Sequence, residues 1–166
     1  LRAAEFLGAR TVRIDAGGGH QEVEWTAEQF DYIVKGYQEM ARRASDHGYR
    51  IGPENHWGAA ANPTSLKRLC QAVDSPAFGV LLHLNRWHGP EAEDGDAIVA
   101  PWTMHTHLTG GIPDGALYDK MTALRDSGYD GYWSVEYPST RYSEIELRLA
   151  QARDVLERWR LEGGQP

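Results

Sequence analysis

Segments with the pattern of β-strands alternate with helix-like segments along the whole chain, and this alternation constrains the fold more than any other feature. Five runs rich in apolar and β-branched residues have strand character: 11–15, 49–54, 78–84, 102–108 and 131–137. Four segments have the three- and four-residue apolar spacing of amphipathic helices: 27–47, 63–73, 117–127 and 143–160. Because parallel strands need crossover connections, the alternation predicts an α/β fold with about five parallel strands.

Two architectures satisfy this alternation: an open doubly wound sheet or part of a (β/α)8 barrel. No GxGxxG motif and no P-loop follows a predicted strand, so the nucleotide-binding form of the open sheet loses its best support. A complete barrel takes about 200–250 residues or more. The 166 residues of this chain would therefore supply only five of the eight βα units, in a single domain covering residues 1–166.

Composition narrows the possible partners and the setting. The net charge is −7 and no basic stripe occurs, which argues against nucleic-acid binding. The single cysteine, Cys70, excludes an internal disulfide and a thiolate-rich metal cluster, and it fits a reducing cytoplasm. No apolar run reaches the roughly 18–20 residues that a membrane span needs. We therefore expect a cytoplasmic protein that neither crosses a membrane nor binds nucleic acid.

The start of the sequence and the number of strands predict an incomplete barrel. The chain opens with "LRAAEFLGAR", which has no initiator methionine, no signal-peptide pattern and the character of a helix interior. This opening suggests a fragment of a longer chain. Five parallel strands would also leave two open sheet edges, which favour association, so a homo-oligomer is possible.

Four titratable residues lie at or near the ends of successive predicted strands. They are Glu54, His83, His107 and Glu136, separated by 29, 24 and 29 positions. Each interval is about one βα unit long, so parallel strands would bring all four side chains to the same carboxyl-terminal end of the sheet. Two carboxylates and two imidazoles suit Mn²⁺, Zn²⁺, Co²⁺ or Fe²⁺ better than Ca²⁺, which prefers oxygen ligands only.

Structural roles compete with metal binding at each position taken alone. A glutamate at a strand end is most often a loop carboxylate or the partner of a neighbouring arginine. His83, inside "VLLHLN", has the surroundings of a hydrogen-bonded core histidine. His105 and His107 share one face of their strand, so either is suited to be the ligand, or neither is. The metal site is favoured because all four residues stand at the same point, the strand end, of successive βα units.

Several stretches resemble the xylose-isomerase-like (β/α)8 superfamily of sugar and sugar phosphate isomerases and epimerases. The more specific ones are "YRIGPENHWG" and "LRDSGYDGYWSVEYP"; looser ones are "LGARTVRIDAG", "DSPAFGVLLHLNRWH" and "MHTHLTG". The resemblance implies a partial TIM-type barrel made of the fourth to eighth strands. It also implies a divalent ion (Mn, Zn, Co, Fe or Mg) bound by Glu54, His83, His107 and Glu136. His83 stands where the family usually has Asp, which would shift the preference toward Zn²⁺, Fe²⁺ or Co²⁺.

The resemblance also implies a reaction. A small sugar or sugar phosphate would be isomerised or epimerised through an enediolate, with Glu54 and Glu136 as catalytic acid and base. Arg86 stands where several members carry a substrate-binding histidine, and it would suit a carboxylate or phosphate. The expected substrate-binding residues are His56, Trp57, Arg86, His88 and Arg13; Trp57, Trp87 and Tyr137 are candidates for an apolar wall or for ordinary packing.

Two other functions stay open at the level of the sequence, and a third is disfavoured. A metal-dependent dehydratase or hydrolase would keep the same site and change the chemistry. A metal-binding fragment without catalytic activity would follow from the missing strands. An endonuclease-IV-like DNA repair enzyme is disfavoured, since it needs a His-rich trinuclear cluster and a basic surface, while this chain is acidic with seven scattered histidines.

Overall fold

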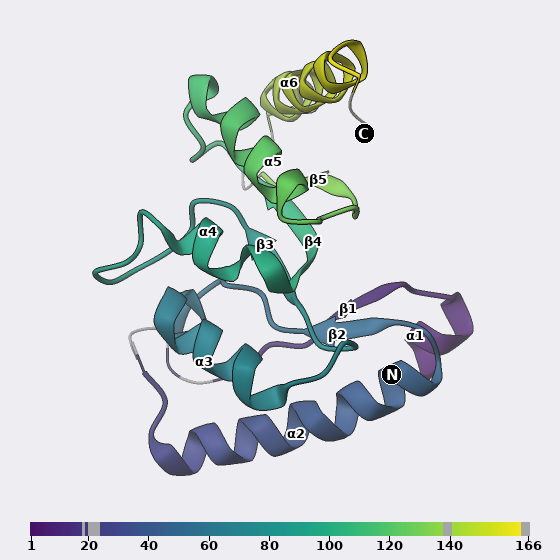
Figure 1. Cartoon of the computed structure of the whole chain (residues 1–166), viewed down its shortest axis with the longest axis vertical. Helices are drawn as coiled ribbons and strands as arrows, with labels where there is room; N and C mark the ends of the chain where they lie inside the picture. The colour runs from purple at the N-terminus through teal and green to yellow at the C-terminus, as the bar shows by residue number, and fades with distance from the viewer. Residues whose placement is uncertain (18, 20–23, 138–140, 164–166) are drawn as a thin grey trace.

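The computed structural model describes residues 1–17, 19, 24–137 and 141–163 (Figure 1). The strands are β1 Thr11–Arg13, β2 Arg50–Gly52, β3 Val80–His83, β4 Thr103–Leu108 and β5 Trp133–Val135. The α-helices are α1 Arg2–Leu7, α2 Ala27–Asp46, α3 Pro63–Val73, α4 Gly95–Val99, α5 Leu117–Asp126 and α6 Tyr142–Leu161. Three short 3₁₀ helices connect them: η1 Gly58–Ala61, η2 Ala100–Trp102 and η3 Asp114–Ala116. Of the described helices, none combines the length and apolar character that a membrane crossing requires.

All described strand pairs are parallel and follow the order of the chain. β1 pairs with β2, and β3, β4 and β5 form a continuous three-stranded sheet. Backbone bonds join the two sheets, from Ile51 N to Ala77 O and from Gly79 N to Ile51 O, each 2.9 Å. In Figure 1 the units follow one another in chain order, with α2 and α6 at opposite ends. The predicted α/β fold with five parallel strands is therefore confirmed, as a barrel that the described residues do not close.

Helix α2 begins and ends where the sequence supplies terminal signals. The side-chain oxygen of Thr26 accepts a hydrogen bond from Gln29 N (3.2 Å), and Thr26 N donates to Gln29 Oε1 (2.8 Å), which satisfies two otherwise unpaired donors. Gly48, with φ of 72°, follows the helix end. On the buried face, Tyr37 donates to Ile14 O (2.5 Å) and packs against Phe78, which holds β1 and β3 in place.

The acidic segment 91–96 contains one largely buried carboxylate, that of Asp96. Helix α4 begins at Gly95, and Asp96 points inward with only 13% of its side chain exposed. Its carboxylate accepts hydrogen bonds from Trp87 Nε1 (2.8 Å), Lys120 Nζ (2.6 Å) and Asn85 N (3.0 Å). Composition alone misses this role because it depends on donors from two separate parts of the chain, the loop 85–87 and helix α5.

At the amino-terminal ends of the strands, Arg50 ties three strands together. Nη1 donates to Thr103 O and Nη2 donates to Phe78 O, each at 3.1 Å. Burial lowers the pKa of Arg50. The guanidinium lies beside Gly79, where a Cβ atom would come within 2.8 Å of Nη2. Arg50 borders a hollow of about 480 Å³, but because carbonyl groups accept from both of its Nη atoms, we assign it a structural role.

Candidate metal centre and active site

The four residues singled out by their spacing lie together at the carboxyl-terminal ends of the strands. Glu54 follows β2 by two residues, and Glu136 follows β5 directly. His83 ends β3 and pairs in register with His107 of β4. Because the strands are parallel, their carboxyl ends lie at one end of the sheet, where barrel enzymes hold their active sites.

Three imidazoles converge on one carboxylate oxygen. Oε1 of Glu54 lies 2.8 Å from Nδ1 of His83, 3.1 Å from Nδ1 of His56 and 3.2 Å from Nδ1 of His107. On the other side, Oε2 of Glu136 lies 3.2 Å from Nδ1 of both His83 and His107. The Glu54 side chain is fully buried, whereas that of Glu136 is 41% exposed. The two carboxylates thus contact the same two imidazoles.

This arrangement fits a divalent cation. A carboxylate oxygen has two lone pairs, so it cannot accept three well-aligned N–H bonds, and the buried Nδ1 of His56 indeed has no hydrogen-bond partner. Donors about 2.1 Å from one ion lie about 3.0–3.4 Å apart in octahedral or tetrahedral geometry. The observed separations of 2.8–3.2 Å come close to that range. One ligand atom from each of Glu54, His56, His83 and Glu136 lies within 4.8 Å of the others.

This candidate metal-binding group contains three of the four predicted ligands and one residue predicted for another role. His56, expected to contact substrate, lies in the group with Glu54, His83 and Glu136. His107 lies against both carboxylates but outside this tightest set. The ring centroid of His105 lies 5.9 Å from that of His107. Nε2 of His105 lies 2.8 Å from Oγ of Ser134. Of the two histidines on β4, only His107 lies next to the carboxylates.

Neighbouring groups stabilise the charged form of the Glu54 side chain. Burial by itself would raise the pKa of Glu54, but the imidazoles of His107, His83 and His56 around its carboxylate and the charge of Arg13 lower it well below its usual range. Arg13 Nη1 contacts Glu54 Oε2, while its Nε and Nη2 each donate to Asp15 at 2.9 Å. These neighbours favour the ionised form of Glu54 and make it a weak base.

Asn55 connects the glutamate loop to the end of β3. It is fully buried; its Oδ1 accepts from His83 N (2.6 Å), and its Nδ2 donates to His83 O (2.9 Å) and to Arg86 O (3.1 Å). The amide side chain thereby makes the hydrogen bonds to the backbone of His83 that a neighbouring strand would make, at the point where β2 has ended. Both His83 and Arg86 depend on this one side chain for their backbone positions.

Replacing Asn55 with alanine is expected to weaken both folding and metal binding. The loss leaves buried backbone groups unpaired, so the free energy of unfolding should fall by about 1–3 kcal/mol in urea denaturation. Metal affinity should fall by about 10–100-fold, because a residue that orients a ligand is lost. Gln38→Ala, which removes a single exposed amide bond to Ala72 O, is the matched control and should change neither quantity measurably. Unchanged metal affinity in Asn55→Ala would contradict the positioning role.

A pocket of about 570 Å³ opens directly beside the carboxylates. Its walls combine parts of the metal-binding group with loops that follow β3, β4 and β5. Tyr137 lies against Gly110, where a Cβ atom would come within 2.2 Å of the phenol oxygen, so only glycine lets the ring pack there. The lining residues are His56, His83, Asn85, Arg86, Thr109, Gly110, Gly111, Glu136 and Tyr137.

Not all of the predicted substrate contacts border this pocket. Arg86 and His56 line it, and Arg13 reaches Glu54 from β1. His88 is exposed and lies outside the lining. Trp57 contacts the ring of His56 without lining the pocket, and Trp87 is buried against Gly95. Of the three aromatic residues proposed for an apolar wall, only Tyr137 lines the pocket.

The loop Thr109–Gly111 is the part of the pocket that sequence reasoning missed. Thr109 Oγ1 accepts a hydrogen bond from Gly111 N (3.1 Å), and Gly111 O accepts one from Asn85 Nδ2 (3.1 Å). The signal was available, since "TGG" follows the strand of His107 immediately. Glycines directly after a barrel strand often permit close approach of backbone to a ligand.

Comparison with known proteins agrees with the fold. A family model for the xylose isomerase-like TIM barrel matches residues 1–160, so the chain belongs to this family. No curated protein is similar enough to be matched to the chain.

Solved structures share the fold at low sequence identity. A xylose isomerase domain protein from Planctomyces limnophilus superposes with a TM-score of 0.71 at 15% identity, covering 93% of this chain and 61% of that one. A D-tagatose 3-epimerase-like protein gives 0.71 at 19% identity, covering 95% and 67%. The probable 3-DHS dehydratase of petrobactin synthesis from Bacillus anthracis gives 0.66 at 15% identity, covering 90% and 64%. The chain thus spans about three fifths to two thirds of these structures.

Proposed function

We propose that this protein is a divalent-metal-dependent isomerase or epimerase of a small sugar or sugar phosphate. The observation that carries the proposal is the pair Glu54 and Glu136, which contact the same imidazoles beside a pocket at the carboxyl-terminal strand ends. The family supports this assignment, and so do relatives of the same fold that are described as sugar epimerases.

Glu54, His83 and Glu136, with His56 or His107, would hold the ion. When bound, a divalent ion supplies Lewis-acid stabilisation of negative charge next to a substrate carbonyl. The mixed nitrogen and oxygen donors suit Mn²⁺, Fe²⁺, Co²⁺ or Zn²⁺, while Mg²⁺ prefers oxygen alone. Three imidazoles near two carboxylates therefore place Mg²⁺ last among the candidates.

The two carboxylates differ in their fitness as a base. Glu136 lines the pocket and is partly exposed, so its oxygens are within reach of a bound substrate. Glu54 is fully buried and its pKa is held low, which reduces its basicity. We assign to Glu136 the removal of the proton next to the carbonyl, which yields an enediolate. Epimerisation would also need Glu54 to take up a proton from solvent and give it to the other side of the enediolate, while Glu136 releases its proton to solvent; the low pKa of Glu54 disfavours that protonated form.

The remaining pocket groups would orient the substrate. Tyr137 offers an aromatic face for the C–H side of a sugar, while Asn85, Thr109 and His56 offer hydrogen bonds to hydroxyl groups. The pocket volume of about 570 Å³ lies within the range of small-molecule sites. Its walls close only part of the way round, because β1 and β5 do not pair with each other among the described strands.

The test combines metal content with turnover of a panel of ketoses and ketose phosphates. Protein treated with EDTA should lose both its bound ion and its activity, and Mn²⁺ or Co²⁺ should restore both. Elemental analysis should find about one ion per chain, as expected for one mononuclear centre. Activity that persists without any metal would rule the proposal out.

Two alternative functions keep the same site. A dehydratase reaction is favoured by the fold likeness to the probable 3-DHS dehydratase, and it would show as loss of water from the substrate rather than as a new epimer. A metal-binding barrel fragment without catalysis would bind the ion and turn over none of the panel. Product analysis by NMR separates these outcomes.

A further inference from the structure

Arg86 is a cation in the pocket wall with no carboxylate beside it. Its Nε donates to His56 O (3.1 Å), which directs the side chain along the wall. Within the described part of the chain, no acidic side chain lies within salt-bridge distance of its guanidinium. Arg13, which contacts Glu54 from β1, differs in this respect, since it is paired with both Asp15 and Glu54. Arg86 therefore retains donors for a ligand.

The backbone around Arg86 is fixed on both sides. Asn85 has a left-handed conformation with φ of 64°, and its N donates to Asp96, which also binds Trp87 Nε1. The carbonyl of Arg86 accepts from Asn55 Nδ2 at 3.1 Å. A backbone that is already fixed loses less conformational entropy when a ligand binds. This favours a ligand-binding role for Arg86 over the role of a solvated surface residue.

The charge of the whole site also favours an anion. Glu54 and Glu136 would balance a divalent ion, and Asp15 balances Arg13, so the guanidinium of Arg86 leaves one excess positive charge. This excess occurs on a chain whose net charge is −7. Thr109 lies in the same wall, and because its oxygen accepts from Gly111 N, its hydroxyl proton is free to donate to a ligand.

We propose that the substrate of this site carries an anionic group, a carboxylate or a phosphate, that binds the guanidinium of Arg86. The inference rests on the proposed function and narrows its substrate class to sugar acids or sugar phosphates. A planar guanidinium binds both groups with paired, charge-assisted hydrogen bonds. Neutral sugars would leave this donor without an acceptor of matching charge.

The test measures binding of three matched probes to the full-length, Mn²⁺-loaded protein by isothermal titration calorimetry. Glycerol, D-glycerate and glycerol 3-phosphate share a hydroxylated three-carbon skeleton and differ in the charged group. At least one anion is expected to bind about tenfold or more tighter than glycerol. In Arg86→Gln this preference should disappear while Mn²⁺ affinity is kept, and Arg86→Lys should retain part of it.

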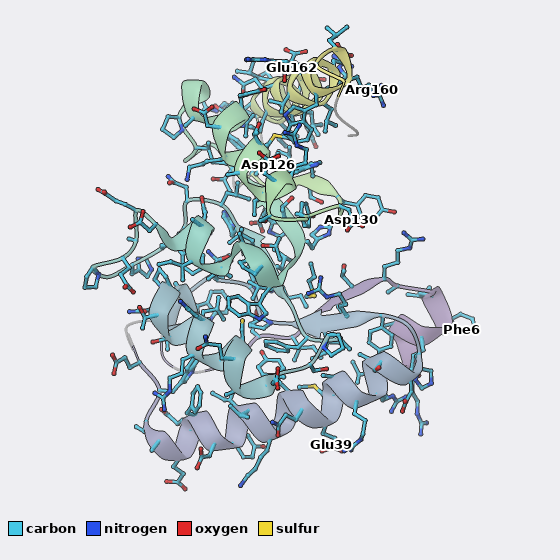
Figure 2. The ribbon with its side chains drawn as sticks, viewed as in Figure 1. Phe6, Glu39, Asp126, Asp130, Arg160 and Glu162 are labelled. Atoms are coloured by element: carbon cyan, nitrogen blue, oxygen red, sulfur yellow. The ribbon has the colours of Figure 1, made fainter. Side chains whose placement is uncertain are left out.

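Arg160→Gln is the matched control, because Arg160 is exposed on α6 and lies away from the strands (Figure 2). It should keep the full preference for the anion. An Arg86-dependent gain for D-glycerate alone identifies a carboxylate, for glycerol 3-phosphate alone a phosphate, and for both the shared anion chemistry. Equal binding of all three probes overturns the inference. So does a preference that survives Arg86→Gln, since the metal ion would then bind the anion.

The proposed function can fail separately. Arg86-dependent anion binding without turnover of any ketose or ketose phosphate would overturn the isomerase assignment and uphold the anion site. Turnover of neutral ketoses together with no preference for either anion would uphold the isomerase assignment and overturn the anion site.

Discussion

Replacing Glu136 with glutamine is expected to reduce kcat by about 10²–10⁴-fold, the contribution typical of a positioned general base. The amide keeps the size of the side chain but cannot take up the substrate proton, and it weakens the contacts with His83 and His107. Since Glu136 is also a candidate metal ligand, metal content has to be measured along with turnover. Steady-state kinetics at saturating Mn²⁺ separates a loss of chemistry from a loss of the ion.

Glu39→Gln provides the control for this experiment. Glu39 lies on α2, on the side away from the strands, so the same chemical change there should leave kcat and metal content unchanged (Figure 2). Full turnover together with full metal content in Glu136→Gln would show that the proposed acid–base mechanism is wrong. Full metal content with strongly reduced turnover would support Glu136 as the base.

Replacing Gly52 with alanine is expected to cost about 3 kcal/mol or more of folding stability, or to prevent folding. A Cβ atom at Gly52 would lie 1.6 Å from Gly79 O and 2.7 Å from Gly79 C, both backbone atoms of the neighbouring segment. Relief requires β2 and β3 to move apart, which breaks the bond from Gly79 N to Ile51 O. It would also displace Glu54, two residues further along. Equilibrium unfolding in urea or guanidinium chloride measures the loss.

Gly36→Ala is the matched control for this substitution. Gly36 lies inside helix α2, and a Cβ atom there meets nothing within 4 Å. Alanine should therefore stabilise the protein by about 0.5–1 kcal/mol through its higher helix propensity. A small effect of Gly52→Ala would mean that β2 and β3 are less closely joined than the backbone bonds between them imply.

The elements of the fold were predictable because local pattern and tertiary structure agree. Helix α3 has the predicted bounds, Pro63–Val73, and is capped by Asn62, whose side chain accepts from Ser65 N (3.1 Å). The strands were placed correctly but are shorter than predicted; β2, for example, covers only Arg50–Gly52 of the predicted 49–54. The extended backbone continues past these bounds, with a hydrogen bond from Leu81 N to Pro53 O (2.9 Å), so the difference lies in where the regular pairing ends.

For the candidate site, the regular spacing of the titratable residues along the chain was the most informative feature of the sequence. The intervals between Glu54, His83, His107 and Glu136 predicted that they share one end of the sheet, and the structure brings them together. The positions of His56 and Asn55 beside His83 were not predictable in the same way. Both belong to the turn after β2, whose path depends on the bonds that Asn55 makes with β3.

What the sequence determined by itself is the order of parallel units and the end of the sheet to which its titratable residues belong. Both follow from periodicity, since a crossover unit has a characteristic length and parallel strands have a common direction. Only the tertiary structure decided which groups meet: His56 with the candidate metal-binding group, Asp96 with the loop of Arg86, and Arg13 with Glu54. These contacts join side chains across turns and between strands, where no periodic pattern records distance and the backbone path sets the partners.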